Sequence, residues 1–86
     1  MREAVIVSYA RTGLAKTGRG SLNDTHGITM AGHAIKHALA RANVEPEAVE
    51  DVFLGTAQPE GATGHNVARN AALWAGCPSS TSGATI

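Results

Sequence analysis

Apolar and polar positions along the chain predict a β-α-β-α-β order of elements. Residues 4–7 form a short, continuous apolar run rich in β-branched side chains, which is typical of a buried parallel strand. Similar runs predict further strands at 52–57 and 82–86, and a helix at 66–75 separates these two. Because helices and strands alternate, right-handed crossovers and a parallel sheet follow, so the predicted fold class is α/β.

The first helix is expected between the first two strands. Asp24 or Thr25 can cap its N-terminus, and Asn43 follows its end, where a residue that tolerates the left-handed conformation is wanted. Pro46 then suits the start of a short helical turn through Val49. A stripe about 100° wide collects the apolar side chains of the helix, namely Ile28, Ala31, Ile35, Ala38, Leu39 and Ala42.

The second helix is bounded by clear start and stop signals. Asn66 is a good N-cap, and Gly76 and Pro78 stand where a C-terminal glycine and a following proline end a helix. Alanines recur at helical spacing between these signals, at positions 68, 71, 72 and 75. A helix lined with alanine allows its neighbours to approach closely, so we expect tight packing here.

Size and composition narrow the classes of function. Eighty-six residues make at most one small domain. Seven basic and seven acidic side chains are scattered without a basic run, which excludes nucleic acid as an expected partner. No apolar stretch approaches the about 20 residues that span a membrane. A single cysteine and the lack of a signal-peptide pattern favour a cytoplasmic location.

Two sequence patterns are considered as ligand sites, one for a nucleotide and one for a metal ion, and neither is complete enough to predict such a site. The loop with Gly13 and Gly18 lacks both the P-loop and the dinucleotide-binding spacing, so no nucleotide site is expected. His33 and His37 lie four residues apart and could reach one metal ion, but a stable zinc site needs three or four ligands. Solvated histidines are the favoured interpretation for both and for His26, and no metal or cofactor is expected.

Cys77 is the only thiol in the chain. It follows the predicted C-terminus of a helix, where the helix dipole raises the pKa of a thiol instead of lowering it. We therefore expect a packing residue, and no catalytic residue is predicted within the chain.

Four segments, in order, resemble the thiolases. GATGHNVARNAALWAGCP at 61–78 is similar to the family pattern GxGQNPARQAALxAGLP. EAVIVSYARTG resembles the first strand and turn of the family, and EPEAVEDVFLGTA resembles its second strand with the helical lead-in. The final GATI stands where thiolases place the strand that enters the nucleophile loop. The resemblance covers nearly the whole chain.

The resemblance implies a layered α/β/α/β/α fold of two similar halves, of which 1–86 would be the incomplete start of the N-terminal half. It implies an acyltransferase that performs a Claisen condensation of acyl-coenzyme A or thiolysis of 3-ketoacyl-coenzyme A. The acylated cysteine would lie beyond Ile86, within about five positions. Coenzyme A thioesters would be substrates, with no separate cofactor. The expected partners are the remainder of the thiolase polypeptide and further copies, as a homodimer or homotetramer.

Three residues mark a possible pocket or dimer-interface loop by the same resemblance. His65 and Asn66 occupy the Gln-Asn positions of the family, with histidine replacing glutamine. Asn66 also has an adequate interpretation as a helix cap. Arg69 matches an arginine of the family, and its alternative role is an ion pair with an acidic loop residue or the partner subunit.

Two other functions stay open on the sequence. The chain could belong to a non-catalytic member of the superfamily that binds acyl thioesters or a partner protein. It could also be an unrelated small α/β interaction module. The sequence that follows Ile86 would separate these hypotheses, because only the catalytic one requires a cysteine there.

Overall fold

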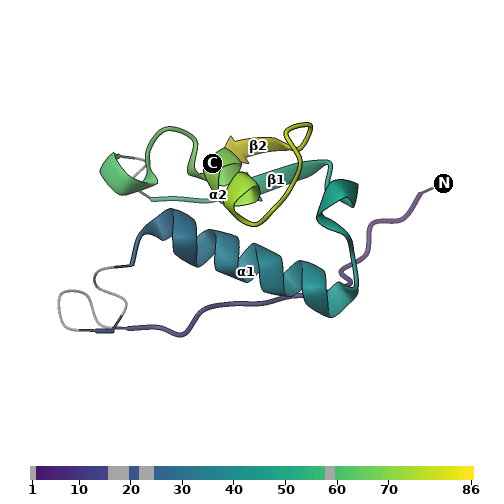
Figure 1. Cartoon of the computed structure of the whole chain (residues 1–86), viewed down its shortest axis with the longest axis horizontal. Coiled ribbons are helices and arrows are strands. Elements are labelled where there is room, and N and C mark those ends of the chain that lie inside the picture. The colour runs from purple at the N-terminus through teal and green to yellow at the C-terminus, as the bar shows by residue number, and fades with distance from the viewer. Residues whose placement is uncertain (1, 16–19, 22–24, 58–59) are drawn as a thin grey trace.

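The computed structural model describes residues 2–15, 20–21, 25–57 and 60–86, and Figure 1 shows their arrangement. The loop residue Gly18 and the cap candidate Asp24 lie outside these ranges. Along the chain, the elements are α1 (Gly27–Ala42), the 3-10 turn η1 (Pro46–Ala48), β1 (Asp51–Leu54), η2 (Gly61–Thr63), α2 (Val67–Trp74) and β2 (Ser82–Thr85).

The two strands confirm the predicted parallel sheet. β1 and β2 pair in parallel, with Asp51 opposite Ser82 and Leu54 opposite Thr85. The ladder continues past both strands, because the amide of Ile86 donates to the carbonyl of Leu54 at 2.8 Å and the amide of Thr56 donates to the carbonyl of Ile86 at 2.9 Å. The α/β class predicted from the alternation of elements is therefore correct.

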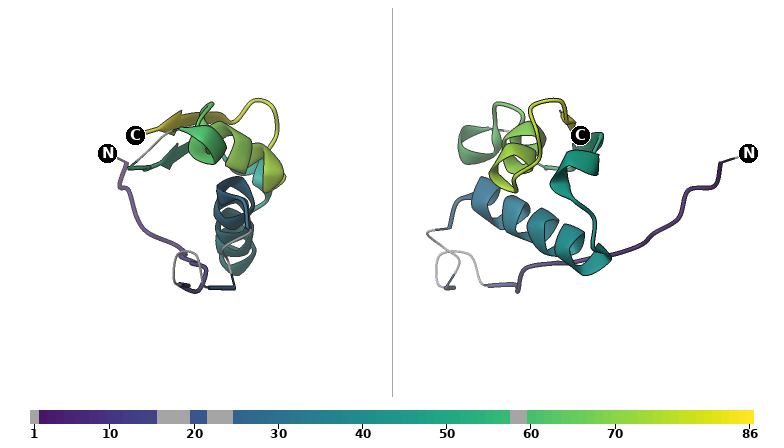
Figure 2. Two further views of the ribbon diagram at one scale, coloured as in Figure 1. Left: turned by 90° about the vertical axis from the view of Figure 1, so that its left-hand side faces the viewer. Right: turned by 45° about the vertical axis from the view of Figure 1, so that its right-hand side comes forward.

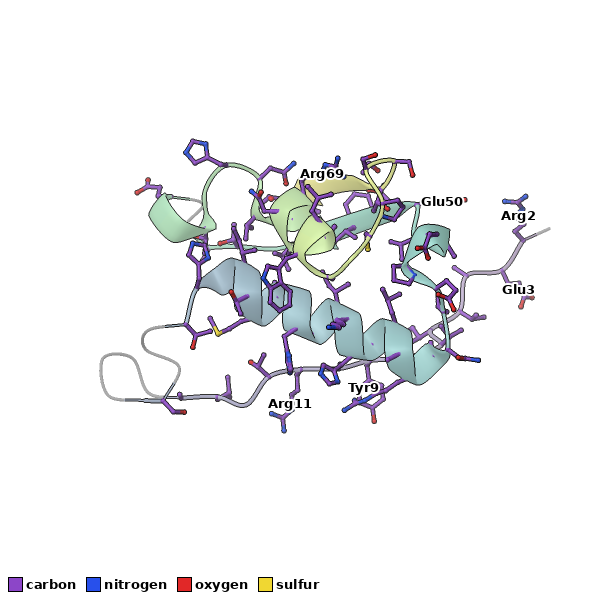
Figure 3. All side chains as sticks on the ribbon, viewed as in Figure 1. Arg2, Glu3, Tyr9, Arg11, Glu50 and Arg69 are labelled. Carbon is purple, nitrogen blue, oxygen red and sulfur yellow. The ribbon has the colours of Figure 1, made fainter. Side chains whose placement is uncertain are left out.

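The predicted first strand at 4–7 is wrong. Val5 and Ile6 are 73% and 91% exposed, and the sheet that the described residues form has only the strands β1 and β2. Figure 1 shows the chain near the N-terminus extending beyond the C-terminal end of α1, away from the sheet, and Figure 3 shows Arg2 and Glu3 at this free end. An apolar run indicates what a segment can bury, but a strand also needs a neighbouring edge to bond, and that edge is set by tertiary structure.

α1 begins and ends on local hydrogen bonds. Its N-cap is His26, whose Nδ1 accepts from the amide of Ile28 at 3.1 Å, so the prediction of Thr25 as the cap is wrong. The predicted end is confirmed: Asn43 is left-handed with φ 57° and ψ 39°. The amides of Asn43 and Val44 donate to the carbonyls of Ala40 and Leu39, which closes the last turn.

α2 is capped as predicted at both ends. The side chain of Asn66 accepts from the amide of Arg69 at 3.3 Å. Gly76 has φ 98°, a conformation open to glycine, and the amides of Gly76 and Cys77 donate to the carbonyls of Leu73 and Ala72. The helix therefore stops at Trp74 and the chain turns back toward the sheet.

The core lies where α2 packs between α1 and the sheet, as the two views of Figure 2 show. Its buried apolar side chains are small: Val67, Ala68, Ala71, Ala72, Ala75 and Cys77. Small side chains let the helix axes and strands approach closely, which confirms the expectation for the alanine-lined helix. The apolar stripe predicted on α1 is only half-buried.

Candidate functional site

The candidate site lies where the N-terminus of α2 meets the carboxyl end of β2. Asn66, the residue that caps α2, makes two further side-chain hydrogen bonds to β2. Its Nδ2 donates to the carbonyl of Gly83 at 2.9 Å, and its Oδ1 accepts from Oγ1 of Thr85, also at 2.9 Å. One amide side chain thus caps a helix and holds a strand that lies 17 to 19 residues further along the chain.

Thr85 completes this connection. Its Oγ1 accepts from the amide of Ala68 at 3.2 Å while it donates to Asn66. Two amides of the first turn of α2, those of Ala68 and Arg69, are therefore satisfied by Thr85 and Asn66. We call Asn66, Gly83 and Thr85 the α2–β2 clamp.

Gly83 belongs to the clamp because of its small size. A Cβ at this position would lie 2.8 Å from both the Cα and the amide nitrogen of Arg69, closer than real Cβ contacts allow. The backbone of β2 therefore rests directly on the first turn of α2, without a side chain between them.

Arg69 points from α2 to the loop that leads into β2 (Figure 3). Its guanidinium donates to the carbonyls of Thr81 and Ser79, the latter at 3.0 Å. The buried Thr81 in turn donates its hydroxyl to the carbonyl of Val49 at 2.7 Å. The structure thus gives Arg69 uncharged backbone acceptors, in place of the acidic loop residue considered from the sequence.

Of the three residues predicted from the sequence, His65 is the one whose side chain takes no part in these contacts between α2 and β2. Its side chain is exposed, and its backbone is left-handed with φ 52°, as is the neighbouring Asn66 with φ 54°. Its carbonyl accepts from Nδ2 of Asn70 at 2.9 Å. The structure therefore brings Asn66 and Arg69 together in the first turn of α2, while the imidazole of His65 stands apart from the clamp.

The remaining candidates behave as packing or surface residues. Cys77 is 5% exposed, and burial, followed by the nearby negative charge of Glu47, raises the pKa of its thiol. The ring centroids of His33 and His37 lie 4.2 Å apart, on the exposed side of α1. Among the described residues, no three side chains of the metal-binding types come together, and no helix is long and apolar enough to cross a membrane.

Sequence reasoning missed two members of the site, Gly83 and Thr85. Both lie in SGATI, for which the sequence predicts only a strand that enters the nucleophile loop. Gly83 and Thr85 are two residues apart, so they share one face of the predicted strand, and this pairing is a weak signal for contact with a helix. Nothing local indicated that Asn66 would be their partner.

The arrangement binds strand to helix through neutral hydrogen bonds and backbone contact. The groups that form it are amides, a hydroxyl and backbone carbonyls, and together they hold β2 against the first turn of α2.

Comparison with known proteins extends these observations. The model of the thiolase N-terminal domain family matches residues 4–86. Proteins named 3-ketoacyl-CoA thiolase are similar over the whole chain: those of Aliivibrio salmonicida (strain LFI1238) at 36% identity, Vibrio vulnificus (strain YJ016) at 37% and Bacillus subtilis (strain 168) at 37%. The chain spans about a fifth of the length of these relatives, 22% in each case.

Proposed function

The chain belongs to the thiolase N-terminal domain family, and from that premise we propose that it works as the N-terminal part of an acyltransferase acting on coenzyme A thioesters. The reaction is the thiolysis of a 3-ketoacyl-coenzyme A or its reverse, a Claisen condensation. The observation that carries the proposal is the match over residues 4–86 together with the name shared by the relatives.

The proposed reaction proceeds through a cysteine in the residues that follow β2. Its thiolate attacks the 3-keto carbon, and the bond between C2 and C3 breaks. The departing acetyl-coenzyme A enolate takes a proton at C2. The sulfur of a second coenzyme A then forms a bond to the acyl carbon as the bond from that carbon to the cysteine breaks, which frees the thiolate. The proton lost by the coenzyme A thiol balances the one that the enolate took. Cys77 is unsuited to this role because it is buried and its pKa is raised.

The partners in this proposal are the rest of the thiolase polypeptide and further copies, in a homodimer or homotetramer located in the cytoplasm. Uncovered apolar surface supports a need for partners. Phe53 on the open face of the sheet is 65% exposed, and Leu73 and Trp74 on α2 are 44% and 49% exposed. Such side chains favour burial against other protein surfaces.

The full-length protein tests the proposal. Acetoacetyl-coenzyme A and longer 3-ketoacyl-coenzyme A substrates are mixed with coenzyme A, and loss of the enolate absorbance is followed. Thiolysis that depends on added coenzyme A is the expected result. Replacing the cysteine after β2 by alanine should abolish it. Tight acyl-coenzyme A binding without turnover would contradict the proposal and support a non-catalytic, thioester-binding member of the family.

A further inference from the structure

The carboxyl end of β2 is held from two sides. On one side, the ladder with β1 extends through Ile86, whose amide and carbonyl bond to Leu54 and Thr56. On the other side, the α2–β2 clamp fixes Gly83 and Thr85 against the first turn of α2. Together these contacts set both the position and the direction of the chain where β2 ends.

The clamp has more contacts than helix capping requires. An N-cap needs one acceptor for an amide of the first turn, and Asn66 provides it with Oδ1 to Arg69. The Nδ2 bond to Gly83 and the bond from Thr85 to Oδ1 go to groups of β2, not to further amides of the helix. They connect the cap to the strand, so a shift of Asn66 would shift the end of β2.

We propose that Asn66 and Thr85 are positioning residues for the nucleophile of the acyl-transfer reaction, an inference that rests on the proposed function. They do not touch the substrate. They hold β2 so that the cysteine that follows it is presented at the correct place and angle. Small displacements of a reacting group are costly, since a shift of about 1 Å can lower the rate about 100-fold.

The test uses a matched set of variants in the full-length protein. Thr85→Val keeps the shape of the side chain but removes the hydroxyl that bonds Asn66 and Ala68. Thr85→Ser keeps that hydroxyl and serves as the rescue. Ser82→Ala is the control on the same strand, because the hydroxyl of Ser82 bonds Asp51 at 2.6 Å, outside the clamp.

The expected result separates turnover from binding. Thr85→Val should lower kcat by about 10- to 100-fold while KM changes by less than about threefold. Thr85→Ser and Ser82→Ala should stay within about threefold of wild-type kcat. The pH dependence of iodoacetamide alkylation at the cysteine after β2 should also shift in Thr85→Val, but not in Thr85→Ser or Ser82→Ala. The reason is that the displaced thiolate no longer lies in the same surroundings, and these set its pKa.

Asn66→Asp provides a second variant in case Thr85→Val does not fold. It keeps an acceptor for the helix cap but loses the donor to the carbonyl of Gly83, and the same fall in kcat is expected. Wild-type kcat and an unchanged alkylation profile in both variants would overturn the inference. A wild-type protein without thiolysis would overturn the proposed function instead, while the alkylation profile would still report whether the clamp positions the thiol.

Discussion

Gly32 of α1 lies directly against the indole ring of Trp74 of α2. A Cβ at position 32 would overlap that ring and would lie 3.3 Å from the carbonyl oxygen of Ala71. Gly32 is the buried residue of α1, and Trp74 is half-exposed above it. The absence of a side chain at position 32 therefore sets how closely the two helices approach.

Gly32→Ala should lower the free energy of unfolding of the full-length protein by about 1–2 kcal/mol, because overpacking outweighs the gain of up to about 1 kcal/mol in helix propensity. Urea unfolding measures it. In a Trp74→Ala background the same substitution should cost less, since the overlapping ring is gone. Gly13→Ala is the control, with no atom within 4 Å of the added Cβ. Equal costs in both backgrounds would contradict this account.

Gly83→Ala should destabilise more strongly, by about 2–3 kcal/mol. The added Cβ meets the backbone of Arg69 at 2.8 Å, and backbone atoms of a helix cannot move aside as a side chain can. Thermal and urea unfolding of the full-length protein measure the loss. Gly55→Ala is the matched control, since its nearest contact is the carbonyl oxygen of Ile86 at 3.8 Å. A stable Gly83→Ala protein would show that β2 does not rest on α2.

Arg69→Lys should cost about 1.5–3 kcal/mol of stability, because one ammonium group cannot reproduce the two guanidinium bonds to Ser79 and Thr81. The acceptors are uncharged carbonyls, so this cost should be nearly independent of salt. Urea unfolding at about 0.1 M and about 1 M salt measures it, because this increase shortens the screening length from about 10 Å to about 3 Å. A cost that disappears at high salt would indicate an ion pair.

Cys77 should contribute to stability in a pH-dependent way. Its pKa is raised above the ordinary value of 9.0 by burial and by Glu47, so the folded state disfavours the thiolate. The stabilisation is then fully present below about pH 9 and is lost as the pH rises through the raised pKa. Unfolding measured between neutral and alkaline pH should show a shallower alkaline decline for Cys77→Ala than for wild type. The same decline in both proteins would contradict the assignment.

Turnover gives a separate test of the same residue. Cys77→Ser should keep kcat within about threefold of wild type, because a buried packing thiol does not reach the reacting atoms. A loss of about 1000-fold, equal to about 4 kcal/mol of transition-state stabilisation, in a folded protein would make Cys77 catalytic.

The sequence by itself determined the features that are satisfied within a few residues. Asn43, Asn66 and Gly76 end or begin helices through hydrogen bonds that span no more than five positions. The buried alanine face of α2 could also be predicted from the sequence, because helical spacing places those side chains on one side of the helix. The parallel pairing of β1 and β2 followed from the crossover rule.

Only the tertiary structure decided which distant groups meet. Thr85 and Gly83 became partners of Asn66 because the crossover returns β2 to the first turn of α2. Arg69 donates to backbone carbonyls of a folded loop, and such acceptors cannot be predicted from the pattern of side chains in the sequence. Residues 4–7 have the composition of a strand but lie unpaired and exposed. A helix cap forms hydrogen bonds with residues next to it in the sequence. A strand and the α2–β2 clamp instead depend on where the fold places segments that are many residues away.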